Sequence, residues 1–156
     1  MKFKVVAVGK LKESYLKDAL NEYVKRIGRF ATVEIVEVDE CKSLGAQLDK
    51  EIERVKRCEG EAILGRLEGY VVAMDIDGKQ FSSEQLSEHL QQQKQFNSTF
   101  TFVVGGSNGL SDEVKQRADL RCSFGKITLP HQLFRVVLLE QLYRACCIEN
   151  NIAYHK

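Results

Sequence analysis

The sequence has 156 residues, of which 44% are hydrophobic and 29% charged, and its formal net charge is +1. These values are typical of one soluble globular domain, residues 1–156, and exclude a disordered or fibrous chain. The near-neutral charge also excludes binding to nucleic acid through an overall basic surface, so any such contact must come from a local patch.

The first third of the chain alternates between strand and helix patterns. Residues 2–9 form an apolar, β-branched run closed by a glycine, which predicts a buried strand. From about Ser14, apolar residues recur at the spacing of one helical stripe, and Gly28 stands near the end of that pattern. Strict alternation over residues 33–38 predicts a half-buried strand.

A charged, helix-period segment over residues 44–64 predicts the second helix. Residues 70–75 predict a third strand, after which the sequence IDGK predicts a turn. The next helix begins with Ser82 as N-cap, and Gln85 stands at the position of its capping-box partner.

The last third of the chain repeats the alternation. Residues 99–104 predict a fourth strand, and the glycine-rich loop GGSNGL leads to a short helix capped by Ser111. The sequence CSFGKITL, residues 122–129, predicts a fifth strand or extended segment. A long final helix begins at Pro130, because a residue without an N–H costs least in the first turn.

Five strand-to-helix alternations favour a three-layer α/β fold with a mostly parallel sheet. In such sheets ligands bind at the carboxyl ends of the strands. The loops after Asp75, Val104 and Ile127 are therefore where we expect the chemistry to lie.

The sequence shows neither a membrane span nor a signal peptide. No run approaches the roughly 20 apolar residues of a membrane span, and the apolar stretch before Gly9 is too short for a signal peptide. We therefore expect a cytoplasmic protein.

The five cysteines of the chain are most simply small buried hydrophobic residues in a reducing compartment. Because they do not cluster with other metal ligands, we expect no metal site. They are Cys41, Cys58, Cys122, Cys146 and Cys147.

The glycine-rich loop allows one sharp alternative. Residues 105–109 match G-x-S-x-G, the nucleophile elbow of serine hydrolases, and Ser107 is followed by Asp119 and His131 in the chain order of a catalytic triad. The match is short, and a separate N-cap at Ser111 intervenes where an elbow would turn directly into helix. A loop that uses its glycines only for a tight turn is the simpler interpretation.

The final helix is apolar on all sides, with no wide polar face. A helix of this kind must be buried all round, so we expect one side to pack on the sheet and the other on a second copy of the chain. His131 in its first turn lies beside unpaired backbone N–H groups, which disfavour a positive charge. We expect His131 to shape the site as a neutral hydrogen-bonding group.

The last residues, NIAYHK, place an aromatic ring beside two groups that can carry positive charge. A solvated tail is the simplest interpretation of a terminus. Stacking on a base and contact with phosphate nevertheless use these residue types.

The segments MDIDGK, FVVGGSNGLSDEV, SFGKITLPHQLFRVVLLEQLYRA and a terminal YHK, in this order and spacing, resemble the ribosomal RNA large subunit methyltransferase H family. The resemblance covers essentially the whole chain. It implies a SPOUT-class homodimer that carries a C-terminal trefoil knot, which general topology rules would discard. It also implies that S-adenosylmethionine is the methyl donor and that N3 of a pseudouridine in 23S rRNA, in the 70S ribosome, is the target.

The resemblance also implies site residues. Tyr154 and His155, from the same or the partner subunit, would hold and deprotonate the base, and the general base itself stays open between them. The cofactor would contact the ends of the third, fourth and fifth strands: Met74, Gly105, Phe124, Gly125, Lys126, Ile127, Thr128 and Leu129. Phosphates would be held by Arg135, Arg144 and Lys156.

The chain departs from the family pattern at two places. It has SFGK where the family prefers SFSK, and CCIENNIAYHK where the family has a basic turn. The second change removes cations from the tail. A serine hydrolase that uses Ser107 and a non-catalytic dimer that binds the ribosome remain the alternatives.

Overall fold

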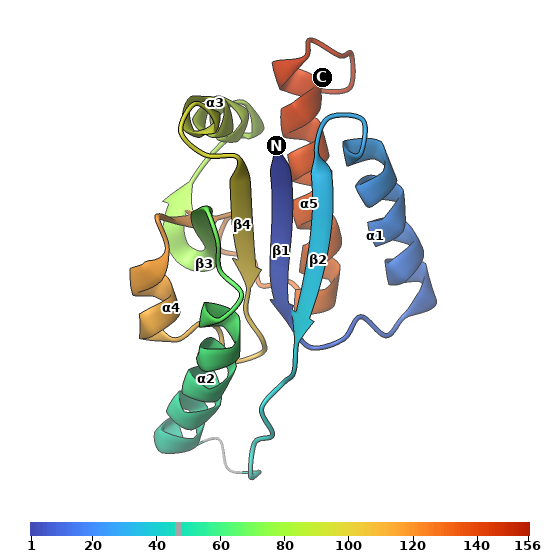
Figure 1. Cartoon of the computed structure of the whole chain (residues 1–156). Coiled ribbons are helices and arrows are strands. Elements are labelled where there is room, and N and C mark those ends of the chain that lie inside the picture. The colour runs from blue at the N-terminus through green and yellow to red at the C-terminus, as the bar shows by residue number, and fades with distance from the viewer. Residues whose placement is uncertain (46–47) are drawn as a thin grey trace.

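The element order of the computed structural model, which describes residues 1–45 and 48–156, confirms the expected alternation of strands and helices (Figure 1). The ten elements are β1 (Lys2–Val8), α1 (Ser14–Ile27), β2 (Thr32–Val38), α2 (Asp49–Leu64), β3 (Tyr70–Gln80), α3 (Ser83–Lys94), β4 (Thr99–Val104), α4 (Asp112–Arg117), β5 (Leu120–Ser123) and α5 (His131–Glu149).

The sheet is parallel throughout, with strand order β2-β1-β4-β3-β5. Strand β1 lies between β2 and β4, and its register with β2 runs from the pair Lys2 and Thr32 to the pair Val8 and Val38. Parallel sheets need cover on both faces, which is why β1 and β4 are apolar runs without a solvent-facing side.

Helices cover both faces of this sheet and create a three-layer structure. Phe3, Val5 and Ala7 of β1 pack with residues of α1, α3 and α5, whereas Val6 and Val8 pack with residues of α2 and α4. Successive side chains of a strand point to opposite faces, so one short strand contributes to both cores. Figure 1 shows α5 behind the sheet between α1 and α3.

Strand β3 is longer than expected, and the turn predicted at IDGK is wrong. The strand continues to Gln80, and its pairing with β5 shifts register between Met74 and Lys79. The extra residues form an irregularity that the chain accommodates within the strand, because the backbone of Gly78 lies directly against that of Arg121. A side chain at residue 78 would not fit there.

The expected helix over residues 44–64 begins later, at Asp49. Residues 46–47, which that range included, lie outside the described residues.

The predicted helix caps are confirmed. Ser82 accepts from the Gln85 amide and Gln85 reaches back to the Ser82 amide, and Ser111 accepts from the Val114 amide. Pro130 flanks the first turn of α5, as its chemistry requires.

The cysteines divide into two groups. Cys122, Cys146 and Cys147 are free and buried, as expected of small hydrophobes. Cys41 and Cys58 instead form a disulfide between the segment after β2 and helix α2. The expectation of a buried thiol is therefore wrong for these two, because both lie on a helix face or segment that borders solvent.

One side of α5 fills the core, with Leu138, Leu139 and Leu142 completely buried. On its other side Val136 and Val137 are half-buried, and Leu133 is 38% exposed. No helix in the described part of the chain combines the length and apolarity needed to cross a bilayer.

Candidate functional site

Two of the expected site segments follow strands, and the third lies inside the strand between them. Gly105 follows β4 and Phe124 follows β5. Met74 lies within β3, the strand between these two, where it pairs with Cys122 near the end of β5. Asp75, the next residue, is held by Arg121, with 3.5 Å between Nη1 and Oδ2. The expected loop after Asp75 is wrong, because β3 continues to Gln80. The loops after β4 and β5 do lie at the carboxyl ends of their strands.

The glycine-rich loop after β4 forms a tight turn. The amide of Gly109 donates to the carbonyl of Gly106 over 3.0 Å, and Gly109 has φ +83°, which L side chains rarely adopt. Ser107 at the tip is exposed. The glycines therefore serve the turn and keep backbone groups at the surface of the site.

The loop after β5 is held by its first residue. The amide of Gly125 donates to Ser123 Oγ over 3.1 Å, and Gly125 has φ +109°. Phe124 stacks on Phe134 of α5 with 5.5 Å between ring centroids. Beyond this anchor the side chains point outward: Lys126, Ile127 and Thr128 are exposed, and Leu129 is half-buried.

The two loops leave room for a flat ligand bound through backbone groups. A methyl group added at Gly109 or Gly125 would meet no other heavy atom within 4 Å, apart from adjoining residues. Open space beside backbone in an extended or left-handed conformation allows close approach of a ring and hydrogen bonds to N–H and C=O groups. Of the residues expected at the cofactor site, Gly125 borders such open space, whereas a Cβ atom at Gly105 would stand 3.0 Å from Gly109 and from Leu110.

The structure does not assemble the alternative hydrolase triad. Asp119 accepts from the Val71 amide at 2.8 Å, and the nearest carboxylate to His131 is that of Glu40, 3.7 Å from Nε2. Among the residues that the structure describes, no hydrogen bond joins Ser107, Asp119 and His131. Nucleophilic activation requires such contacts, so the geometry gives the hydrolase no support.

Arg135 lies in the interior, which corrects its expected role as a phosphate contact. The side chain is 1% exposed. Its guanidinium donates to Glu37 Oε2 at 2.8 Å, to the Val8 carbonyl at 2.8 Å and to the Gly9 carbonyl at 2.7 Å. A buried guanidinium bound in this way is unavailable to a phosphate on the surface.

The tail folds back along α5. Tyr154 Oη donates to Glu140 Oε1 at 3.0 Å, and Tyr154 packs edge-on against Tyr143. At 1.5 Å rise per residue, Glu140 lies about 14 Å along the helix axis from His131, where the cofactor loop ends. The expected catalytic tail and the expected cofactor loop therefore meet different parts of α5 in one chain.

His155 connects the tail to two neighbouring helices. Its Nε2 lies 2.6 Å from Glu84 Oε1 of α3, and its Nδ1 lies 3.2 Å from Arg144 Nη1. The Glu84 amide, His155 and Ser82 lower the pKa of Glu84 to about 2. Arg144 also binds Glu140 and lies over the Tyr154 ring at 4.7 Å. The structure thus brings together Arg144, Tyr154 and His155, and leaves Lys156 exposed.

Burial and the hydrogen bond to Glu140 raise the pKa of Tyr154 to about 12. A carboxylate acceptor favours the neutral phenol. Near neutral pH Tyr154 is therefore a hydrogen-bond donor in this arrangement.

Two acidic residues near the strand ends were missed at the sequence level. Glu37 binds both Arg135 and the Leu11 amide, the latter over 2.7 Å. Glu59 is 4% exposed. Glu59 had a signal in the sequence, because it stands four residues from both Val55 and Ile63 on the buried stripe of α2. Glu37 had none, since an alternating strand places it as an ordinary solvent-facing acid.

In residues 1–45 and 48–156, no three His, Cys, Asp or Glu side chains are grouped so that they could hold a metal ion.

Comparison with solved structures supports the fold. A protein assigned to the methylase family from Haemophilus influenzae Rd KW20 superposes with a TM-score of 0.53 at 10% identity, over 99% of this chain and 70% of that one. A protein classed as a methyltransferase from Legionella pneumophila, solved with the cofactor SAM bound, gives 0.51 at 12% identity, over 93% and 66%.

Comparison of sequences is more specific. The family model described as "Predicted SPOUT methyltransferase" matches residues 1–155. Ribosomal RNA large subunit methyltransferase H from Streptococcus pneumoniae, in strains CGSP14 and 70585 among others, is 49% identical over 160 aligned positions that span 100% of both chains. The chain therefore belongs to the SPOUT methyltransferases, in the family of ribosomal RNA large subunit methyltransferase H.

Proposed function

We propose that the protein transfers a methyl group from S-adenosylmethionine to N3 of a pseudouridine in 23S rRNA, in the assembled 70S ribosome. The observation that carries this proposal is the 49% identity, over the full length of both chains, to proteins named for modification of large-subunit rRNA. The loops after β4 and β5, with Met74 in the strand between them, supply a place for the reaction.

The cofactor would be held by Met74, by Gly105 and by the loop of residues 124–129. Backbone N–H and C=O groups of these segments would bind the adenine ring and exclude water from it. When bound, S-adenosylmethionine supplies an electrophilic methyl group on a sulfonium centre, which leaves as a neutral sulfide. The rest of the reaction concerns how the chain places and deprotonates the acceptor.

The acceptor nitrogen carries a weakly acidic proton, so the chain must remove that proton and align the nitrogen with the methyl group. His155 is the residue in the tail suited to take the proton. Tyr154, whose phenol proton is donated to Glu140 in this chain, would turn from that carboxylate to donate to a base oxygen. Arg144 and Lys156 would hold phosphates, and Arg135 has no such role because it is buried.

A homodimer would bring one chain's tail to its partner's cofactor loop. Ile127 in that loop is 83% exposed and Leu133 in the first turn of α5 is 38% exposed. Exposed apolar side chains at these two positions favour a second copy of the chain as their cover. We further propose that the loop before α5 is part of the trefoil knot, and that the protein works where ribosomes assemble, in the cytoplasm.

The direct test is methyl transfer from labelled S-adenosylmethionine to 70S ribosomes, separate subunits and naked rRNA, with the modified nucleoside identified by mass spectrometry. We expect label in 23S rRNA of 70S particles. Label at another nucleoside would contradict the assigned target, and binding to ribosomes without transfer would favour a non-catalytic dimer.

The tail is tested by deleting residues 154–156. We expect the truncated protein to bind S-adenosylmethionine normally and to lose transfer, because the deletion removes Tyr154 and His155 and leaves the strand-end loops intact. Full-rate transfer by the truncated protein would exclude the tail from the chemistry.

A further inference from the structure

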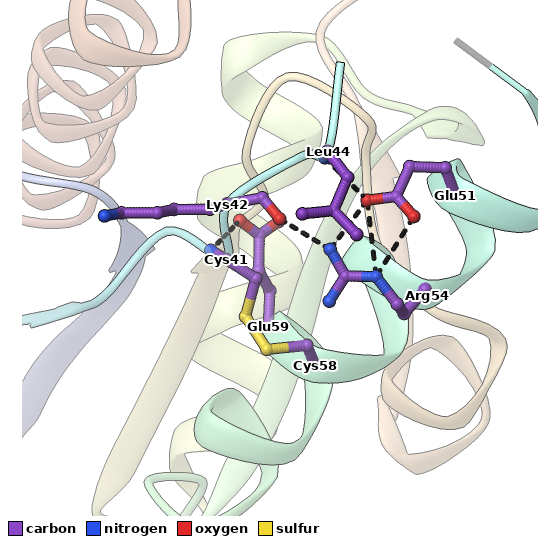
Figure 2. A network of polar contacts seen from close by, with 7 residues as sticks. All are labelled: Cys41, Lys42, Leu44, Glu51, Arg54, Cys58 and Glu59. Carbon is purple, nitrogen blue, oxygen red and sulfur yellow. Dashed lines mark hydrogen bonds and ion pairs between the residues drawn. A yellow bond between two sulfur atoms is a disulfide. The ribbon is translucent and has the colours of Figure 1, made fainter. Parts of the chain in front are cut away.

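The Cys41–Cys58 disulfide lies at the surface, unlike the three free cysteines. Cys58 is exposed on α2, and Cys41 is half-buried in the segment after β2, with 6.2 Å between the two Cα atoms (Figure 2). A thiol in solution can therefore reach the bond. Accessible disulfides are the ones that exchange, whereas buried structural ones resist reduction.

Charged residues of both signs adjoin this pair. Lys42 follows Cys41, Arg57 precedes Cys58, and Arg54 stands one helical turn before Cys58, where its guanidinium donates to the Lys42 carbonyl over 2.5 Å. Figure 2 shows the carboxyl of Glu59 beside Cys41 and Lys42. Arg54 is paired with Glu51 over 2.6 Å, and Glu40 and Glu59 adjoin the two cysteines in the chain, so the surroundings carry both signs of charge. The case for exchange therefore rests on the exposure of the bond.

The disulfide adjoins a buried carboxyl group. Glu59 follows Cys58 in the chain, and its Oε2 accepts from the amide of Cys41 at 3.1 Å. Burial raises the pKa of Glu59. Its other oxygen, Oε1, has no hydrogen-bond partner among the described residues. The Cys41 amide is thus the contact that fixes the orientation of this carboxyl.

Glu59 in turn lies under the glycine-rich loop of the candidate site. A Cβ atom at Gly106 would stand 3.1 Å from Glu59 Oε1. A Cβ atom at Gly60, the next residue of α2, would collide with Ser111 Oγ, which caps α4. Helix α2 therefore contacts both ends of the glycine-rich loop, through Glu59 and Gly60, the two residues that follow Cys58.

We propose that Cys41 and Cys58 form a reversible thiol–disulfide site whose state sets, through Glu59 as a positioning residue, the affinity of the glycine-rich loop for S-adenosylmethionine. The proposal rests on the proposed function for the identity of that ligand. A protein that modifies ribosomes works in a reducing compartment, where disulfides are transient and respond to redox state.

The partner is a small thiol of the glutathione class or a protein dithiol. Its thiolate attacks the exposed sulfur of Cys58, the S–S bond breaks, and Cys41 leaves as a thiolate that takes up a proton. A second thiol then attacks the mixed disulfide and releases Cys58. The protein gains two electrons and two protons, and the two reductant thiols are oxidised to one disulfide.

Reduction removes the covalent tie but not every contact of the segment. The Leu44 amide still donates to Glu51 Oε1 at 2.9 Å, and Arg54 still donates to the Lys42 carbonyl. The segment should therefore stay close to α2 while the Cys41 amide moves away from Glu59. Loss of that one hydrogen bond predicts a decrease in cofactor affinity of roughly fivefold.

The test measures S-adenosylmethionine binding by isothermal titration calorimetry on full-length protein, oxidised with glutathione disulfide or reduced with dithiothreitol. Alkylation under denaturing conditions, followed by mass spectrometry, counts free thiols in each sample. We expect three alkylated cysteines in the oxidised protein and five in the reduced protein, as the pairing requires. The reduced protein should bind more weakly.

Substitutions distinguish the effect of the Cys41–Cys58 disulfide from that of the Glu59 carboxyl group. The double variant Cys41→Ser/Cys58→Ser should bind S-adenosylmethionine with the affinity of the reduced protein, and dithiothreitol should not change that affinity. Glu59→Ala should bind weakly in both states, whereas Glu59→Gln, which keeps an acceptor for the Cys41 amide, should retain the redox dependence. Glu61→Ala, on an exposed part of the same helix, is the matched control and should behave as the native protein.

Equal affinity of oxidised and reduced protein would overturn the proposal, as would five free thiols in the sample treated with glutathione disulfide. A redox dependence that persists in Glu59→Ala would overturn the role of Glu59. Absence of S-adenosylmethionine binding in both states, in protein shown to be folded, would instead overturn the proposed cofactor and this dependence with it.

Discussion

The guanidinium of Arg135 and the carboxylate of Glu37 meet over 2.8 Å and join the last helix to the second strand. The same guanidinium binds the carbonyls of Val8 and Gly9, where β1 ends. One side chain therefore satisfies backbone acceptors of the loop that follows β1 and fixes the start of α5 beside the sheet. Glu37 completes the arrangement by accepting from the Leu11 amide.

Arg135→Met should lower the free energy of unfolding by about 3 kcal/mol, because it leaves buried carbonyls and a carboxylate without their donor. Urea denaturation followed by circular dichroism measures the loss. Glu37→Gln, which keeps an acceptor on a side chain that is 37% exposed, should cost only about 1 kcal/mol. Equal losses in the two variants would show that Arg135 stabilises the fold through Glu37 alone and that its contacts with the Val8 and Gly9 carbonyls add nothing.

Gly125→Ala should weaken S-adenosylmethionine binding about tenfold, because a left-handed backbone at an L residue costs about 1–2 kcal/mol and the loop would relax to another conformation. Gly125 has φ +109° and open space around it, so the backbone is the constraint. Titration calorimetry gives the affinity.

Gly45→Ala is the matched control, since Gly45 has φ +93° and also lies in open space, but in the loop before α2. Its affinity should be close to native. A similar loss in both variants would trace the effect to general destabilisation.

Ser82→Ala should reduce the free energy of unfolding by about 1 kcal/mol through loss of the capping box of α3. Both hydrogen bonds of the box are formed, at 3.1 Å to the Gln85 amide and 2.9 Å to the Ser82 amide. Thermal denaturation of Ser82→Ala and Ser82→Asp compares a lost cap with a replaced one. Equal melting temperatures for the native protein and Ser82→Ala would contradict the role of the cap.

The Tyr154 phenol should ionise about two pH units above an ordinary tyrosine, since its pKa is raised to about 12. The folded state favours the neutral phenol, so this contribution to stability is complete below pH 10 and is lost as the pH rises from 10 toward 12. Ultraviolet difference titration of the native protein against Tyr154→Phe isolates this tyrosinate. An ordinary pKa would mean that the tail does not dock on Glu140 in solution.

Local patterns predicted most of the fold. Strand and helix periods indicated ten elements in the right order, but the fifth strand predicted at residues 122–129 is wrong beyond Ser123, where the pairing of β5 with β3 ends. The caps at Ser82 and Ser111 were placed correctly because N-capping depends on residues close in sequence. The continuation of β3 through IDGK was missed. That segment is turn-forming by composition, and only its pairing with β5 holds it in the strand.

Side-chain partners across the fold could not be predicted in this way. From the sequence, Arg135 on an apolar helix is expected to be a solvent-facing cation. Its burial depends on hydrogen-bond acceptors that residues 8, 9 and 37 supply. The pairing of Cys41 with Cys58 likewise depends on how the segment after β2 meets α2. The loops after β4 and β5 were predictable because parallel topology places them at strand ends, whereas the loop expected after Asp75 was wrong because β3 continues to Gln80.

The central position of β1 has a consequence for how the chain is made. Strand β1 precedes both of its neighbours, β2 and β4, in the chain, and the guanidinium that binds its end comes from residue 135. A nascent chain therefore holds an apolar strand with one neighbour missing until most of the protein has been translated. Domains that depend on such distant pairings fold slowly and are exposed to aggregation meanwhile. Early chaperone contact with residues 2–8 would be the expected safeguard during translation.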